Sequence, residues 1–229
     1  MVIRGQEIKN LIVAGCSYSS YTEVDSNYST FLSNKLKLNN IDGYNAGCGS
    51  NQRIWRKIIT DIRSGKINSS DLLVIQYTEN TRKEIWSKHH FKTYNVGNVV
   101  KGTPMREQYG DGQLIKFKLG FEGDHKEEEE LFRLFENNFM DEEYEKEIFE
   151  NTHFTLIKTI DSLKIRTVFL NTRYKWDIDL YDSKFCHSVD VKDLLNDKSV
   201  CLSDNDCHHL NERGHEKVAG IIEKYLKEI

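Results

Sequence analysis

Short apolar runs alternate along this chain with longer segments in which apolar residues recur at helical spacing. Two continuous apolar runs, residues 11–14 and 72–77, are typical of buried strands in a parallel sheet, and residues 166–171 predict a further strand. Three segments place apolar side chains three and four positions apart, as amphipathic helices do: residues 27–38, 52–62 and 149–163. Strands that alternate with helices in this way predict βαβ units. We therefore expect an α/β fold with three α/β/α layers around a central parallel sheet.

Weaker patterns predict the remaining elements. Residues 43–46 fit a short second strand, and Ser50 or Asn51 is expected to cap the helix that follows. Residues 177–199 are polar and irregular apart from a short helix at 191–195. Asn211 is the expected N-cap of a closing helix. The apolar face of that helix comprises Val218, Ile221, Ile222, Tyr225 and Leu226.

The chain is long enough for a single domain, and we expect one that spans residues 1–229 with an insertion at about 86–149. Glycines and short alternating runs predict hairpins or loops in the first half of this insertion, placed like a lid over the sheet edge. The second half, residues 124–150, is strongly acidic and could be proposed as a metal site. The favoured interpretation is a solvated helix face opposite Leu131, Phe132, Leu134 and Phe135.

Composition excludes several classes of function. The net charge is −4, so no basic face is expected for nucleic acid. No run approaches the roughly 20 apolar residues of a membrane helix, and the N-terminal residues do not form a signal peptide. Five cysteines, an odd number, favour free thiols in a reducing, cytoplasmic setting. The oligomeric state is left open.

Candidate chemistry gathers where the predicted strands end. Ser17 follows the first strand and Asn80 follows the 72–77 strand, while Gly47 and Gly49 lie in the loop after residues 43–46. Ligands of open α/β sheets bind at this edge. Asp206 and His209, three residues apart, precede the closing helix. A serine nucleophile needs a histidine base and an acid that orients it, although a serine at this position is also commonly a turn or N-cap residue.

Taken together, these residues resemble the SGNH (GDSL-type) hydrolase family, whose four blocks carry Ser, Gly, Asn and His in this order. Four segments carry the resemblance: residues 15–17, 45–49, 71–80 and 206–215. Cys16 stands where the family usually has Asp, and Thr78 and Thr81 replace a Gly and an Asp of the third block.

The resemblance implies a flavodoxin-like fold and ester hydrolysis without metal or other cofactor. Ser17 would be the nucleophile, His209 the base and Asp206 the acid that orients it. The backbone N–H groups of Ser17 and Gly49, with the Asn80 amide, would form the oxyanion hole; Gly49 is favoured over Gly47. The expected substrate is a small-molecule or carbohydrate ester, with an O-acetyl group on a carbohydrate as the default.

Several alternatives remain beside the esterase. The fold could serve as a binding or structural module without turnover, or the enzyme could transfer its acyl group to a sugar hydroxyl instead of water. Cys207, His208, His209 and His215 could be read as a zinc cluster, but such close ligands do not easily converge on one ion. Cys16 is interpreted as a small buried residue and His215 as a polar or helix-packing residue. The Gly47-x-Gly49 pair is a weak dinucleotide signal, because the third glycine is missing.

Overall fold

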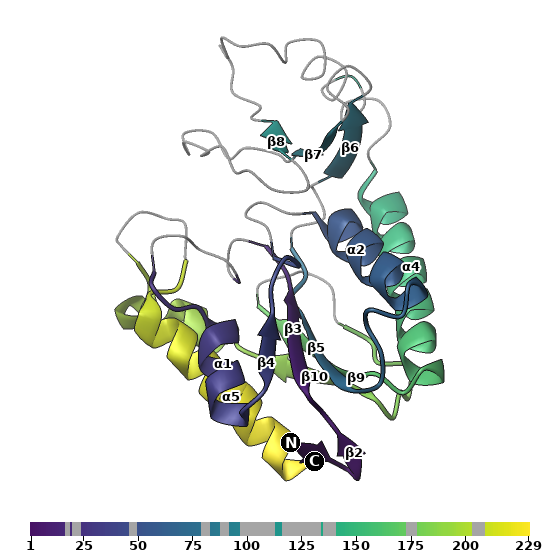
Figure 1. Ribbon diagram of the computed structural model, residues 1–229. Helices are drawn as coiled ribbons and strands as arrows, with labels where there is room; N and C mark the ends of the chain where they lie inside the picture. Colours follow the sequence, from purple (N-terminus) through teal and green to yellow (C-terminus); the bar gives the residue numbers. More distant parts are fainter. Residues whose placement is uncertain are drawn as a thin grey trace.

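The computed structural model describes residues 1–16, 19, 24–45, 50–78, 83–87, 92–96, 113–115, 134, 141–172, 178–202 and 209–229. Its centre is a five-stranded parallel sheet, shown in Figure 1. In chain order the strands are β3 (Asn10–Ala14), β4 (Asn39–Ile41), β5 (Asp71–Ile75), β9 (Arg166–Asn171) and β10 (Cys186–Asp190). In space they follow the order β10-β9-β5-β3-β4.

This strand order is the flavodoxin-like 2-1-3-4-5 arrangement, which confirms the expected fold class. The chain runs from β3 outward to β4 and then returns to β5 on the other side of β3. Ala14 lies opposite Ile75 at the carboxyl ends of the two central strands. Ligands of such sheets bind outside these ends, where the order of the strands reverses. The candidate residues follow β3 and β5 at this point.

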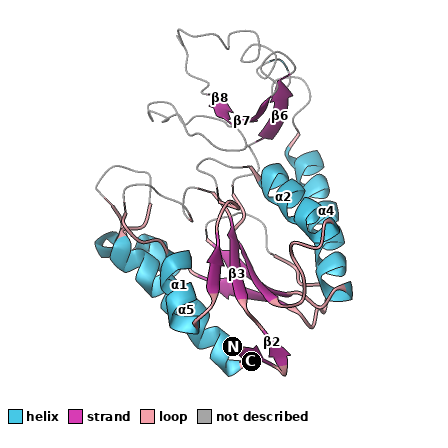
Figure 2. Cartoon of the chain, viewed as in Figure 1, coloured by secondary structure: helices cyan, strands magenta, loops and turns pink. Residues whose placement is uncertain are grey.

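Helices cover both faces of the sheet, as Figure 2 shows. On one face lie α1 (Tyr28–Leu36) and α5 (Glu212–Glu228), and on the other lie α2 (Asn51–Arg63) and α4 (Glu142–Ser162). Alternate residues of each strand contribute to two separate cores. Leu11 and Val13 face the α1–α5 layer, whereas Ile12 and Ala14 face the α2–α4 layer. Both faces of the central strands are buried, which explains their unbroken apolar runs.

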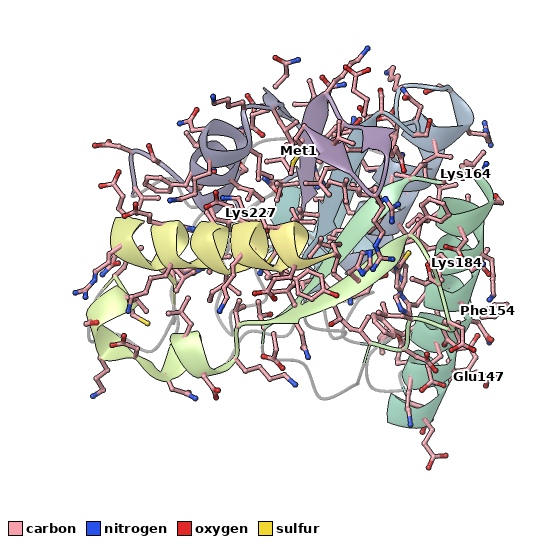
Figure 3. All side chains as sticks on the ribbon, turned by 90° about the horizontal axis from the view of Figure 1, so that it is seen from below. Met1, Glu147, Phe154, Lys164, Lys184 and Lys227 are labelled. Carbon is pink, nitrogen blue, oxygen red and sulfur yellow. The ribbon has the colours of Figure 1, made fainter. Side chains whose placement is uncertain are left out.

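The ends of the chain lie together below the sheet. The hairpin of β1 (Val2–Ile3) and β2 (Gln6–Glu7) is tied to α5 by Arg4, whose Nε donates to the Ile229 carbonyl at 2.8 Å. Figure 3 shows this end from below, with Met1 and Lys227 labelled and with Phe154 and Glu147 on the far helix, α4. None of the described helices combines the length and apolar character that a bilayer crossing requires.

A second, three-stranded sheet lies beyond the carboxyl ends of the central strands (Figure 1). It consists of β6 (Lys83–Ser87), β7 (Lys92–Val96) and β8 (Gln113–Ile115), and β6 lies against α2. These strands fall at the start of the predicted insertion and within it. The lid role remains a prediction.

Several elements differ from the sequence-based expectation. The second strand is β4, upstream of residues 43–46, where only Asn45 among the described residues forms a single bridge, with Gly15. β10 was not predicted, because its polar residues His187, Ser188 and Asp190 break the apolar run. The expected helix at 191–195 is the shorter 3₁₀ helix η1 (Asp193–Asn196), followed by η2 (Lys198–Val200).

Two residues assigned to apolar helix faces are exposed instead. Ile221, expected on the core face of α5, is 37% exposed. Leu134, expected on the apolar side of the acidic segment, is 54% exposed. On α5 the stripe of Val218, Ile222 and Leu226 already fills the space against the sheet, so Ile221 lies at its margin.

The N-terminus of α5 requires a glycine for a steric reason. A Cβ at Gly214 would collide with the Val200 carbonyl oxygen and would lie 2.9 Å from Leu210 Cδ2. A Cβ at Gly220, in the same helix, would meet no described atom within 4 Å. We expect Gly214→Ala to lower the free energy of unfolding by about 1–3 kcal/mol. Urea denaturation measures this change.

Gly220→Ala is the matched control. Alanine has the higher helix propensity, so this variant should be neutral or up to about 1 kcal/mol more stable than the natural protein. Equal effects of the two substitutions would contradict the close approach of α5 to η2.

Candidate active site

The structure describes the four segments singled out in the sequence only in part. Ser17, Gly49, Asn80 and Asp206 lie outside the described residues, whereas His209 lies within them. The residues that flank these positions are described, and they show how each loop is attached. The first and third loops follow β3 and β5, the second leads into α2, and the fourth leads into α5.

The loop after β3 is anchored from below by a buried glutamine. Gln76, the residue after β5, accepts a hydrogen bond from Ser19 Oγ at 2.6 Å through its Oε1. Its Nε2 donates to the Cys16 sulfur at 3.8 Å. The Ser19 N–H donates to the Cys16 carbonyl at 2.9 Å. The residues on either side of positions 17 and 18 are therefore both held to the end of the neighbouring strand.

This arrangement requires Gly15. A Cβ at this position would collide with Ser19 Oγ and would lie 3.2 Å from Gln76 Cβ. Gly15 also forms a parallel bridge with Asn45, which connects the first loop to the segment that leads into the second. Cys16 is fully buried, as expected for a small core residue.

The second and third loops are joined by Asn51. The first residue of α2, it donates from Nδ2 to the Thr78 carbonyl at 2.9 Å and accepts the Thr78 N–H on Oδ1 at 2.7 Å. Both residues are almost completely buried. Ser50 is the N-cap and accepts the Arg53 N–H at 3.2 Å, so one of the two predicted capping residues has that role. An amide that satisfies both backbone groups of Thr78 keeps this end of β5 beside α2.

The fourth loop is held by backbone pairing and by the cap of α5. The Leu202 N–H donates to the His209 carbonyl at 2.9 Å, and Cys201 and Leu210 form an antiparallel bridge. Asn211 is the N-cap, as predicted, and its Oδ1 accepts the Gly214 N–H at 3.0 Å. The Asn211 Nδ2 donates to two carbonyls of the preceding segment, those of Ser199 and Cys201. The backbone is therefore held at the His209 carbonyl and on its C-terminal side, at Leu210 and Asn211.

A buried aromatic pair connects α1 with α5, the helix that follows the fourth loop. The Tyr28 ring stacks on His215, with centroids 6.1 Å apart and planes at 28°. The Tyr28 hydroxyl lies 3.0 Å from Ser19 Oγ. Burial lowers the pKa of His215 to about 4, with a smaller electrostatic contribution from nearby His209. His215 is therefore neutral near pH 7 and packs within the helix layer, in agreement with its interpretation as a helix-packing residue.

The contacts that bring the loops together come mostly from residues without a motif signature. Gln76, Asn51, Ser19 and Tyr28 are polar residues with ordinary neighbours in the sequence, and only their burial reveals their role. Cys207 and His208 of the zinc alternative lie outside the described residues. Within the described ranges, no three His, Cys, Asp or Glu side chains come together as a metal site requires.

Comparison with known proteins gives a structural similarity. No family model matches the chain, and no curated protein matches its sequence. The fold is similar to a solved structure described as "Structure of a putative lipolytic protein of G-D-S-L family from Desulfitobacterium hafniense DCB-2". The two chains are 8% identical, the match covers 94% of this chain and 98% of the other, and the TM-score is 0.47. Chemistry is not transferred at this level of similarity, so the proposal below rests on this chain's own residues.

The Asn51–Thr78 pair gives a direct test of how the loops are joined. We expect Asn51→Leu, which is close in size, to lower the free energy of unfolding by about 2–4 kcal/mol, because it leaves two buried backbone groups of Thr78 without these bonds. Asn51→Asp accepts the N–H but turns an oxygen toward the Thr78 carbonyl, so it should also destabilise the protein. Chemical denaturation measures both variants, with the exposed residue Asn68 changed to Asp as a control.

Protonation of His215 predicts a loss of stability in acid. The unfolded chain binds a proton at this residue near pH 6.5, whereas the folded protein does so only near pH 4, the value to which its pKa is lowered. Between these values the unfolded state binds more protons, so the free energy of unfolding falls as the pH decreases, by up to about 3 kcal/mol, and levels off below pH 4.

The comparison with His215→Phe isolates this contribution. Phenylalanine retains a ring against Tyr28 and does not titrate, so the variant should lose stability less steeply than the natural protein between pH 6.5 and 4. His153 and His187, whose pKa values are also lowered by burial, contribute equally to both proteins. Parallel curves of unfolding free energy against pH would exclude a neutral buried His215.

Proposed function

We propose that this protein is a serine esterase of SGNH type, with Ser17 as nucleophile, His209 as general base and Asp206 as the acid that orients it. One observation carries the proposal: buried hydrogen bonds and one buried ring stack connect the elements that bear the four motif segments, at the switch point of the sheet. Gln76 joins the third loop to the first, Asn51 joins the second to the third, and Tyr28 joins the first to α5, the helix that follows the fourth.

Acylation would begin with attack of Ser17 Oγ on the ester carbonyl carbon. His209 would take the hydroxyl proton, and the Asp206 carboxylate would stabilise the resulting imidazolium. The carbonyl oxygen becomes an oxyanion as the tetrahedral intermediate forms. The N–H groups of Ser17 and Gly49 and the Asn80 amide would donate hydrogen bonds to it.

Collapse of this intermediate would break the bond to the alcohol oxygen, which receives the proton from His209. Water, activated by the same histidine, would then hydrolyse the acyl-enzyme and regenerate Ser17. In this role the base must be positioned precisely, because it transfers a proton in both half-reactions. The hydrogen bond at the His209 carbonyl and the bridge at Leu210 support this role.

The substrate class proposed is a small-molecule or carbohydrate ester with a short acyl group, such as an O-acetylated sugar, and no cofactor takes part. Transfer to a sugar hydroxyl instead of water is the same chemistry with a different acceptor. Two departures from the family pattern fall on residues to which the proposed mechanism assigns no chemical step. Cys16 and Thr78 are both buried and packed in the base of the site, so neither needs to contact substrate.

Labelling with a fluorophosphonate probe tests the nucleophile. We expect one adduct per chain, mapped by peptide mass spectrometry to Ser17 and absent from Ser17→Ala. His209→Ala should label and turn over short acyl esters roughly 10²- to 10⁴-fold more slowly. Asn80→Ala should lower kcat by about 10²-fold or more through loss of one oxyanion donor.

The exposed Ser69, changed to alanine, is the control and should label like the natural protein. A folded protein that forms no adduct would exclude the esterase and favour the alternative of a binding module built on the same fold. In that case the edge of the sheet would be searched for carbohydrate ligands by calorimetry.

A further inference from the structure

Tyr28 contacts both the serine loop and α5, the helix into which the His209 loop leads. It is the first residue of α1, directly after the N-cap Asn27, and is 1% exposed. The cap fixes its backbone, because Asn27 Oδ1 accepts the N–H groups of Ser29 and Thr30 at 3.1 and 3.2 Å. The side chain therefore enters the core from a rigid helix end.

The hydroxyl of Tyr28 completes a hydrogen-bond chain with one direction. The Nε2 of Gln76 donates to the Cys16 sulfur, so its Oε1 faces Ser19. This Oε1 accepts a hydrogen bond from Ser19 Oγ at 2.6 Å. Ser19 Oγ can then accept the Tyr28 proton at 3.0 Å. Burial raises the pKa of Tyr28 well above its usual value, so the hydroxyl keeps this proton. Tyr28 thus donates to Ser19, and Ser19 donates to Gln76.

The ring of Tyr28 contacts the other side of the site. It stacks on His215, which is fully buried and has no hydrogen-bond partner on either ring nitrogen among the described residues. A buried polar group without a partner costs about 1–3 kcal/mol. Because neither nitrogen has a partner among the described residues, hydrogen bonds within them do not fix the position of the imidazole. Its position is set by the Tyr28 stack and by the close packing of Gly214, one residue before it in α5, against Val200 and Leu210.

We propose that Tyr28 is a positioning residue that sets the distance between the Ser17 loop and the start of α5, and through α5 the distance to His209. Its hydroxyl holds Ser19, and its ring holds His215 in the first turn of α5. The importance of this distance for catalysis rests on the esterase proposed above, whereas the contacts of Tyr28 with the serine loop and with α5 do not. Proton transfer between serine and histidine depends steeply on distance, and a misplacement near 1 Å can cost about 10²-fold in rate. Tyr28 touches neither substrate nor reacting atoms in this role.

Two variants separate the two halves of the bridge. Tyr28→Phe removes the hydroxyl and keeps the ring, and Tyr28→Leu removes the stack as well. Tyr225→Phe is the matched control, because Tyr225 packs against the same core and its hydroxyl lies 3.3 Å from His187 Nδ1. It lies ten residues beyond His215 in α5, about 15 Å along the helix axis and away from the site.

We expect Tyr28→Phe to lower kcat by about 10- to 100-fold with KM changed less than about twofold, since ground-state binding does not use the bridge. Its Tm should fall by only about 2–4 °C, the effect of one hydrogen bond. Tyr28→Leu should lose more activity, and Tyr225→Phe should retain kcat. Equal losses of kcat in Tyr28→Phe and Tyr225→Phe would overturn the positioning role.

Amide hydrogen exchange tests the bridge without any activity. Tyr28→Phe should speed exchange at the Ser19 amide about 5- to 10-fold, and Tyr28→Leu should also speed it at Leu202 and His215, while Tyr225→Phe changes none of these. Unchanged exchange at Ser19 in Tyr28→Phe would refute the bridge itself. If the natural protein fails to react with fluorophosphonate, the esterase is wrong, and the exchange result still decides whether Tyr28 joins the serine loop to α5.

Discussion

The candidate site depends on the side-chain amide of Gln76, the residue that follows β5. Its two ends have different partners, because Oε1 accepts from Ser19 and Nε2 donates to Cys16. Bulk solvent does not reach these groups, since Gln76 and Ser19 are fully buried. A buried amide without partners would be costly, so the loop after β3 is held in the arrangement that satisfies it. The turn of the serine loop is thereby coupled to the end of the neighbouring strand.

A similar use of buried polar groups occurs on the α2–α4 face, around Tyr77. Trp55 Nε1 donates to the Tyr77 hydroxyl at 3.2 Å, and this hydroxyl lies 2.8 Å from His153 Nδ1. His153 Nε2 lies 2.8 Å from the Asp179 carbonyl, so it must be the donor of that bond. His153 is then neutral with Nδ1 as acceptor, in agreement with a pKa lowered by burial. The chain of bonds has one direction and connects α2, α4 and the segment after β9.

The side chains of the consecutive residues Gln76 and Tyr77 thus point to opposite faces of the sheet. Each forms hydrogen bonds with the helix layer on its own face. On the α1–α5 side, Gln76 accepts hydrogen bonds from Ser19 and Tyr28. On the α2–α4 side, the Tyr77 hydroxyl is hydrogen-bonded to Trp55 and His153. Thr78, next in the chain, has its backbone bound by Asn51. Three consecutive residues after β5 are therefore tied to the surrounding helices, which makes this strand end the rigid point of the site.

The sequence by itself determined the layers and the catalytic hypothesis. Unbroken apolar strands, helical spacing and capping residues such as Asn211 are local signals, and the structure bears them out. It did not indicate β10, because polar residues interrupt its apolar run: His187 is buried in the strand, Ser188 is partly buried and Asp190 is exposed. The tertiary structure alone decided which polar residues join the loops. Gln76, Asn51 and Tyr28 acquire their roles from hydrogen-bond partners up to 60 positions away and, for Tyr28, also from the ring of His215 in the last helix. Contacts of this range leave no periodicity in the sequence.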